Sequence, residues 1–120
     1  MFNSTARLLT IAIAGLISVG CAASMPGRTY EGKYFYHFEA STFTPKGSEE
    51  RWCVSSTDME RARLPAHEAP SPFGGAWGSA DVIVRGELSP KGNYCSLGAS
   101  PYLLKVHEII KVENMKAGDP

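Results

Sequence analysis

An uncharged apolar run over residues 8–20 stops directly before Cys21, and it limits which part of the chain can fold into a domain. Arg7 supplies one positive charge ahead of the run, and small residues follow it. This order is typical of a secretory signal peptide. As a helix the run would span about 20 Å, too short for a hydrocarbon core of about 30 Å. We therefore expect residues 1–20 to be removed as a signal peptide, which leaves about 100 residues to fold.

Residues 17–21 (Ile-Ser-Val-Gly-Cys) resemble the lipobox of bacterial lipoproteins, with Gly20 before the cysteine and Ser18 where leucine is usual. The resemblance implies that Cys21 is the lipidated first residue of the mature protein. Two or three acyl chains on this residue would anchor the protein stably in a membrane. Ala22 in place of aspartate resembles the outer-membrane sorting pattern of diderm bacteria. We therefore expect a lipid-anchored protein of the outer membrane that faces the periplasm. Ordinary cleavage near residues 22–24 is the alternative and would give a secreted or soluble periplasmic protein.

Two cysteines, Cys53 and Cys95, remain once Cys21 carries lipid. An exported compartment favours their pairing, and both lie in stretches typical of strands, where a bridge across the sheet is geometrically reasonable. The chain-entropy estimate for such a bridge is about 4 kcal/mol. Two buried free thiols are the alternative. A reactive cysteine is disfavoured because the chain has no CxxC motif and no basic residue immediately flanks either cysteine.

The pattern of the mature chain predicts short strands separated by turns rich in glycine and proline. A flexible tether is expected over residues 21–29 and a polar tail over residues 114–120, so the folded domain covers residues 30–113. A short helix is expected over residues 56–64, with a capping box that begins at Thr57. The expected strands are residues 30–40, 50–55, 80–88, 93–97 and 102–113. These elements predict a mainly β fold, either a compact barrel or a curled antiparallel sheet with one short helix.

The segment from Val84 to Tyr94 and the closing strand near Leu104 resemble the back half of a small, partly open OB-like barrel. Together with residues 38–45 and 50–52, they resemble a group of small bacterial lipoproteins of uncharacterised function that carry an OB-like β-barrel domain. In that group an aromatic residue and a glycine stand where this chain has Cys53 and Cys95. The resemblance therefore implies that the two cysteines entered together, as a bridge would require.

The last expected strand contains one interruption of its alternating pattern. Leu104, Val106, Ile110 and Val112 would share one face, and Glu108 falls in the same register. Either a β-bulge or a paired, buried carboxylate is expected there.

Composition and motifs exclude several functions. The chain has 12 basic and 12 acidic residues, and loss of Arg7 leaves a net charge of about −1, so no nucleic-acid partner is expected. The three histidines, His37, His67 and His107, form no HxxxH pair, so we expect no metal and no cofactor. No G-x-S-x-G, S-x-x-K or phosphate-binding loop occurs, so we do not expect an enzyme. An envelope hydrolase is the less favoured alternative and would need converging carboxyl groups or histidines.

Aromatic residues give the strongest indication of a binding surface, although most rings in a small barrel belong to the core. Phe73 and Trp77 lie in a loop rich in glycine and proline, and Glu39 and Arg85 are candidate polar neighbours. The expected function is a structural or interaction module of the cell envelope, with an envelope protein as partner. The alternative is a domain that binds an envelope glycan or another small ligand.

Overall fold

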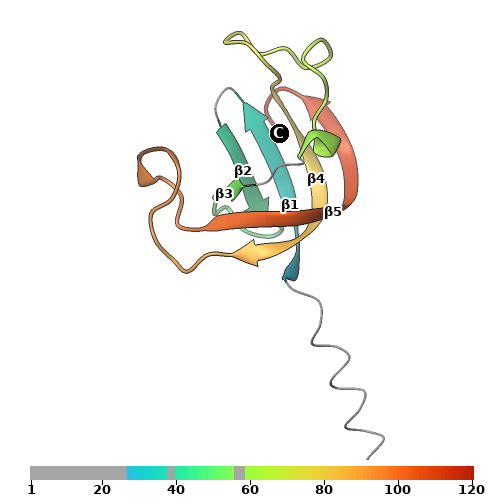
Figure 1. Cartoon of the computed structure of the whole chain (residues 1–120). Coiled ribbons are helices and arrows are strands. Elements are labelled where there is room, and N and C mark those ends of the chain that lie inside the picture. The colour runs from blue at the N-terminus through green and yellow to red at the C-terminus, as the bar shows by residue number, and fades with distance from the viewer. Residues whose placement is uncertain (1–26, 38–39, 56–58) are drawn as a thin grey trace, which may run out of the picture.

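Strands form most of the backbone in the computed structural model, which describes residues 27–37, 40–55 and 59–120 (Figure 1). The elements are β1 (Arg28–His37), β2 (Ala40–Pro45), β3 (Trp52–Ser55), the 3₁₀ turn η1 (Glu60–Ala62), β4 (Gly78–Leu88), the 3₁₀ turn η2 (Ser96–Gly98) and β5 (Leu103–Ala117). The mainly β prediction is confirmed. The predicted signal peptide, the lipidation site at Cys21 and most of the predicted tether lie outside the described residues.

The sheet closes on itself as a ring. The strands pair in the order β1-β2-β3-β5-β4, and β4 pairs again with β1. All pairs are antiparallel except β3 with β5, which is parallel. β5 is the longest strand and curls around one side of the ring (Figure 1).

The interior of the ring holds the hydrophobic core because alternate residues of each strand point inward. The buried residues include Tyr34, Tyr36, Phe43, Ala80, Val82, Val84, Leu104, Val106 and Ile109. Both buried tyrosine hydroxyls have partners, as buried phenols need. Arg63 Nε donates to Tyr34 Oη at 2.8 Å, and the Leu64 N–H donates to Tyr36 Oη at 2.8 Å. The segment after η1 is thereby fastened to the core.

The predicted strand over residues 30–40 corresponds to β1, which ends at His37, and its last residue, Ala40, already belongs to β2. His37 pairs with Ala40, so β1 and β2 form a hairpin. β2 was not predicted; its Phe43 points inward and is buried. A turn at Lys46 and Gly47 follows β2, with Gly47 at a φ of 80°.

Two other predicted elements differ from the structure. Of the predicted helix over residues 56–64, the described part holds only the η1 turn, because Arg63 is extended and reaches the tyrosines; Thr57 of the capping box lies outside the described residues. The predicted strand over residues 93–97 is wrong. Cys95 and Leu97 have φ values of 63° and 56°, and these left-handed conformations turn the chain out of a strand.

β5 bends by means of three irregularities in its pairing with β4. Val84 pairs with Ile109 while Ile83 pairs with Lys111, so Ile110 is an extra residue. The predicted inward position of Ile110 is therefore wrong: Ile109 is buried and Ile110 is half exposed. The two alternatives for Glu108 are also resolved, since it lies next to bulges and on the surface.

The strand also extends past the predicted domain boundary. The polar tail was expected from residue 114, but β5 continues to Ala117, which pairs with Gly78. Asn114, at a φ of 51°, occupies the bulge that lets the strand continue, a conformation that asparagine tolerates better than most residues. At the other end, β1 begins at Arg28, inside the predicted tether.

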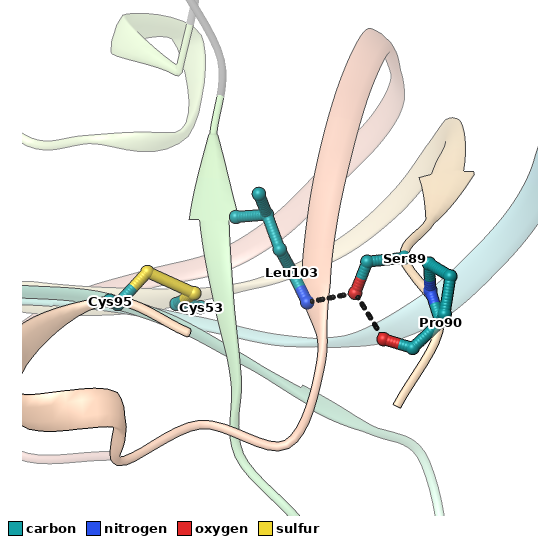
Figure 2. Close-up of a disulfide and its surroundings, with 5 residues drawn as sticks. All are labelled: Cys53, Ser89, Pro90, Cys95 and Leu103. Atoms are coloured by element: carbon teal, nitrogen blue, oxygen red, sulfur yellow. Dashed lines mark hydrogen bonds between the residues drawn. A yellow bond between two sulfur atoms is a disulfide. The ribbon is translucent and has the colours of Figure 1, made fainter. Parts of the chain in front are cut away.

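The predicted disulfide between Cys53 and Cys95 is confirmed, with 6.3 Å between the Cα atoms (Figure 2). Cys53 is buried on β3, and Cys95 lies in the long loop between β4 and β5. The base of this loop is closed by hydrogen bonds: Ser89 Oγ accepts from the Leu103 N–H at 2.8 Å and donates to Pro90 O at 3.0 Å (Figure 2). The bridge therefore fastens the tip of the loop to β3.

Candidate functional site

The outer surface of the ring carries an aromatic cluster where β1 ends and β4 begins. On β1, Phe35 and His37 face away from the core because they alternate with the buried Tyr34 and Tyr36. On β4, Ser79 pairs with Phe35, so the two side chains lie on the same outer face. The connection between η1 and β4 lies at this end of the ring (Figure 1).

Four rings meet there, and we call Phe35, His37, Phe73 and Trp77 the aromatic patch. The His37 ring is the centre: its centroid lies 5.0 Å from that of Trp77, 6.0 Å from that of Phe73 and 6.3 Å from that of Phe35. Phe73 is 67% exposed, whereas the other three rings are half-buried. The patch therefore presents one exposed ring beside three partly covered ones.

Three polar atoms at the patch are buried and have no hydrogen-bond partner: His37 Nε2, Trp77 Nε1 and Ser79 Oγ. They are the full set of such buried side-chain atoms within residues 27–37, 40–55 and 59–120. Ser79 is diagonal to His37 across the β1–β4 pair, which places their Cβ atoms about 7–8 Å apart. Buried polar groups in folded proteins are nearly always paired, and each unpaired group costs about 1–3 kcal/mol. A cluster of three is therefore an unusual concentration of unused hydrogen-bonding capacity.

A tight turn carries Phe73, whose ring packs against that of His37. The Ser71 N–H donates to Gly75 O, and the Gly74 N–H donates to Ser71 O, both at 3.1 Å. Gly74 and Gly75 have φ values of 98° and 74°, which other residues rarely adopt. No atom would contact a Cβ at either glycine, so this turn is not packed on its outer side.

Trp77 is held more firmly than the turn. The backbone N–H of Trp77 donates to Ala69 O at 2.8 Å, and the backbone carbonyl of Trp77 accepts from the Gly118 N–H at 2.9 Å. The extension of β5 beyond the predicted domain boundary therefore helps to position the patch.

A surface groove of about 610 Å³ begins beside the aromatic patch. On the same outer face, the next pair along β1 and β4 after Phe35 and Ser79 is Lys33 and Asp81. The lining comprises Glu31, Gly32, Lys33, Thr44, Pro45, Lys46, Gly47, Ser48, Asp81, Val82, Ile83, Lys111, Glu113 and Pro120. Patch and groove thus follow one another along a single face.

The charges of the groove are paired with one another. Lys33 Nζ lies 2.9 Å from Asp81 Oδ1, Lys46 Nζ lies 3.3 Å from Glu31 Oε2, and Lys111 Nζ lies 3.3 Å from Glu113 Oε1. The hydrogen bond from Lys33 and a second one from Asn114 lower the pKa of Asp81 below its ordinary value of 3.8. The groove therefore has no excess of either sign among its side chains.

The structure brings together only part of the predicted binding surface. Phe73 and Trp77 lie in one patch. Arg85 lies about 25 Å farther along β4, where its Nε is 3.4 Å from Glu108 Oε1. Glu39 lies outside the described residues.

Sequence reasoning missed His37 and Ser79 as members of the site. The alternation of side chains along each strand could have indicated them, because it places His37 and Ser79 on the face of the sheet that points away from the core. The pairing register that joins them was not available from the sequence.

Within the described ranges, no group of three or more histidine, cysteine, aspartate or glutamate residues could hold a metal ion. His107 Nε2 lies 2.6 Å from Glu87 Oε2, but this exposed pair is outside the groove. In the part of the chain that the structure covers, no helix is long and apolar enough to span a membrane.

Comparisons of the chain with protein-family models, with curated proteins and with solved structures find no match.

Proposed function

We propose that this protein is a lipid-anchored, non-catalytic binding module of the cell envelope and that the aromatic patch is its binding surface. The lipid anchor at Cys21 and the outer-membrane location facing the periplasm rest on the lipobox-like sequence. The disulfide is consistent with an exported protein, since disulfides persist in oxidising compartments.

An OB-like barrel is the architecture that we propose for the domain. Five strands form the ring, and β4, β1, β2 and β3 are neighbours in that order. This is the strand order of a Greek key, and the OB-fold is a five-stranded Greek-key barrel. Among the described residues, the connection between β3 and β4 contains no regular helix longer than the η1 turn.

The observation that carries the binding role is the set of three unpartnered polar atoms at His37, Trp77 and Ser79. If these groups served only the fold, the protein would be more stable with them paired or replaced by apolar groups. Their presence next to an exposed Phe73 favours a surface that exchanges hydrogen bonds with a partner. A partner that forms hydrogen bonds with these groups would remove the destabilisation that they cause in the unbound protein.

Photocrosslinking in intact cells tests this proposal. A photoreactive amino acid replaces Phe73 in the full chain, and the matched control places it at Ile110, which is 50% exposed on β5 outside the patch. We expect a discrete adduct from position 73 and a much weaker one from position 110. Trp77→Ala in the position-73 variant should abolish the adduct. Equal labelling at both positions, or no adduct from position 73, would contradict the binding role.

The anchor is tested separately by intact mass. The native protein from a membrane fraction should have the mass of residues 21–120 plus acyl chains. Cys21→Ala should abolish this modification and release the protein from the membrane fraction. Unchanged processing and fractionation of Cys21→Ala would refute the anchor and leave a secreted or soluble periplasmic protein.

A further inference from the structure

The aromatic patch and the groove together form one elongated surface on the outside of β1 and β4. From Trp77, directly before β4, to Ile83 the extended chain spans about 20 Å. Outward residues along it lead from the aromatic patch, past Ser79, to the groove residues Asp81 and Ile83. A ligand that fills the whole surface must therefore be an extended molecule, longer than a single compact small molecule.

The unpartnered polar groups at the patch are uncharged side chains and include both hydrogen-bond donors and acceptors. Trp77 Nε1 can only donate, Ser79 Oγ can donate and accept, and His37 Nε2 does either according to its tautomer. Lys33 and Asp81 neutralise each other, while Lys116, the register partner of Ser79 on β5, is exposed beside the patch. Neutral hydrogen-bonding groups are satisfied by hydroxyls and amides of a ligand, and such a ligand gives up no hydrated charge on binding.

Rings and polar atoms at one place match the two faces of a sugar. The C–H surface of a pyranose packs on the faces of aromatic rings, and its hydroxyls both donate and accept hydrogen bonds. The exposed Phe73 and the half-buried Trp77 supply the rings.

The groove is suited to further sugar units. Its volume of about 610 Å³ lies in the range of small-ligand sites. Its floor includes the half-buried Ile83, and the ion pairs at its sides offer polar atoms without a net charge to neutralise. A neutral saccharide chain loses little on desolvation in such a groove.

We infer that patch and groove bind a neutral oligosaccharide, with one sugar on Phe73 and Trp77 and the following units along the groove. This inference rests on the proposed binding role of the patch and names its ligand class. The polar atoms are buried in the unbound protein, so binding through them requires a local shift that exposes them. The Ser71–Gly75 turn, which carries Phe73 beside the His37 ring, has two glycines and an unpacked outer side that allow it to shift.

Calorimetric titration of the full protein with neutral oligosaccharides of one to six units tests the inference. The probes are β-1,4-linked N-acetylglucosamine and α-1,4-linked glucose oligomers, at concentrations up to about 1 mM. We expect the affinity for one series to rise with chain length. Trp77→Phe keeps a ring but removes the N–H, and the affinity should fall about tenfold, the effect of one lost hydrogen bond. The matched control Ile110→Ala should bind as the native protein does.

Ile83→Lys separates the groove from the patch, because it places a long side chain on the groove floor. It should weaken binding of the hexamer at least tenfold and leave binding of the shortest active oligomer unchanged. Equal affinities for monomer and hexamer would refute the role of the groove. If neither series binds, or if binding survives both Trp77→Phe and Trp77→Ala, the inference is overturned. A specific protein adduct from position 73 together with no sugar binding would leave the proposed binding module standing and refute only this inference.

Discussion

Replacing Ser79 with alanine removes a fully buried hydroxyl that has no hydrogen-bond partner among the described residues. In the unfolded chain this hydroxyl bonds to water, so folding sacrifices that bond without replacement. The cost of such a group is about 1–3 kcal/mol, and alanine avoids it while losing only one small atom from the packing. We therefore expect Ser79→Ala to raise the free energy of unfolding by about 1 kcal/mol.

A matched control comes from a serine whose hydroxyl is paired. Ser41 Oγ lies 3.2 Å from Tyr34 Oη and accepts from Arg63 Nη2 at 3.0 Å. Ser41→Ala makes the same chemical change but leaves an arginine donor without its acceptor. It should lower the free energy of unfolding by about 1–2 kcal/mol. The two substitutions are thus expected to act with opposite signs.

Urea unfolding at 25 °C, with the disulfide intact, measures both effects. The slope of free energy against urea should stay constant, so that the shift in midpoint reports stability alone. In a thermal scan, a gain of 1 kcal/mol corresponds to about 4–8 °C for a domain of this size. A loss of stability above about 0.5 kcal/mol in Ser79→Ala would refute the reasoning, because it would reveal a partner for the hydroxyl. A gain in stability accompanied by weaker ligand binding would identify Ser79 as a residue retained for function.

Three further predictions concern other parts of the fold. Reduction of the Cys53–Cys95 disulfide should lower the free energy of unfolding by about 4 kcal/mol, from the 42-residue separation, in urea titrations with and without reductant; a loss below about 1 kcal/mol would show that the loop is held by other contacts. Leu97→Gly should raise the melting temperature, because Leu97 is fully exposed at a φ of 56° and a left-handed leucine costs about 1–2 kcal/mol; an unchanged or lower value would mean that Leu97 contributes a stabilising contact. Asp81→Asn should destabilise the protein by at most about 1 kcal/mol at pH 7, since the pair with Lys33 is partly exposed. Because the pKa of Asp81 is lowered in the folded protein, the stability that its carboxylate contributes is complete above about pH 4 and is lost as the pH falls through the folded-state pKa. The difference in stability between Asp81→Asn and the native protein should therefore vanish in acid. A difference that persists at pH 2 would contradict this.

Local sequence patterns were sufficient for some features of the protein. The period of two in a strand places Tyr34 and Tyr36 of β1 on one face, and both are core residues. Cys53 and Cys95 were predicted to pair, and the structure confirms the disulfide. Glycine-rich turns were also visible, because residues such as Gly47 supply conformations that others avoid.

Other features depend on contacts between distant segments. The inward face of β5 changes at its bulges, so a period-two pattern selected Ile110 where the folded strand buries Ile109. The expected strand around Cys95 is wrong because Cys95, which the disulfide joins to β3, and Leu97 have positive φ values that local propensity disfavours. Within the described part of the expected helix, only the η1 turn forms; Arg63 directly after it is extended and donates to Tyr34.

The sequence by itself therefore determined the mainly β class, the pairing of the cysteines and two rings of the candidate site, Phe73 and Trp77. These follow from residue chemistry and from neighbours along the chain. Only the tertiary structure decided that His37 and Ser79 join those rings and that Arg85 does not. The physical reason is register: a shift of one residue between β1 and β4 would move every outward side chain of a strand to the other face. That register is decided by packing inside the closed ring and not by any local pattern.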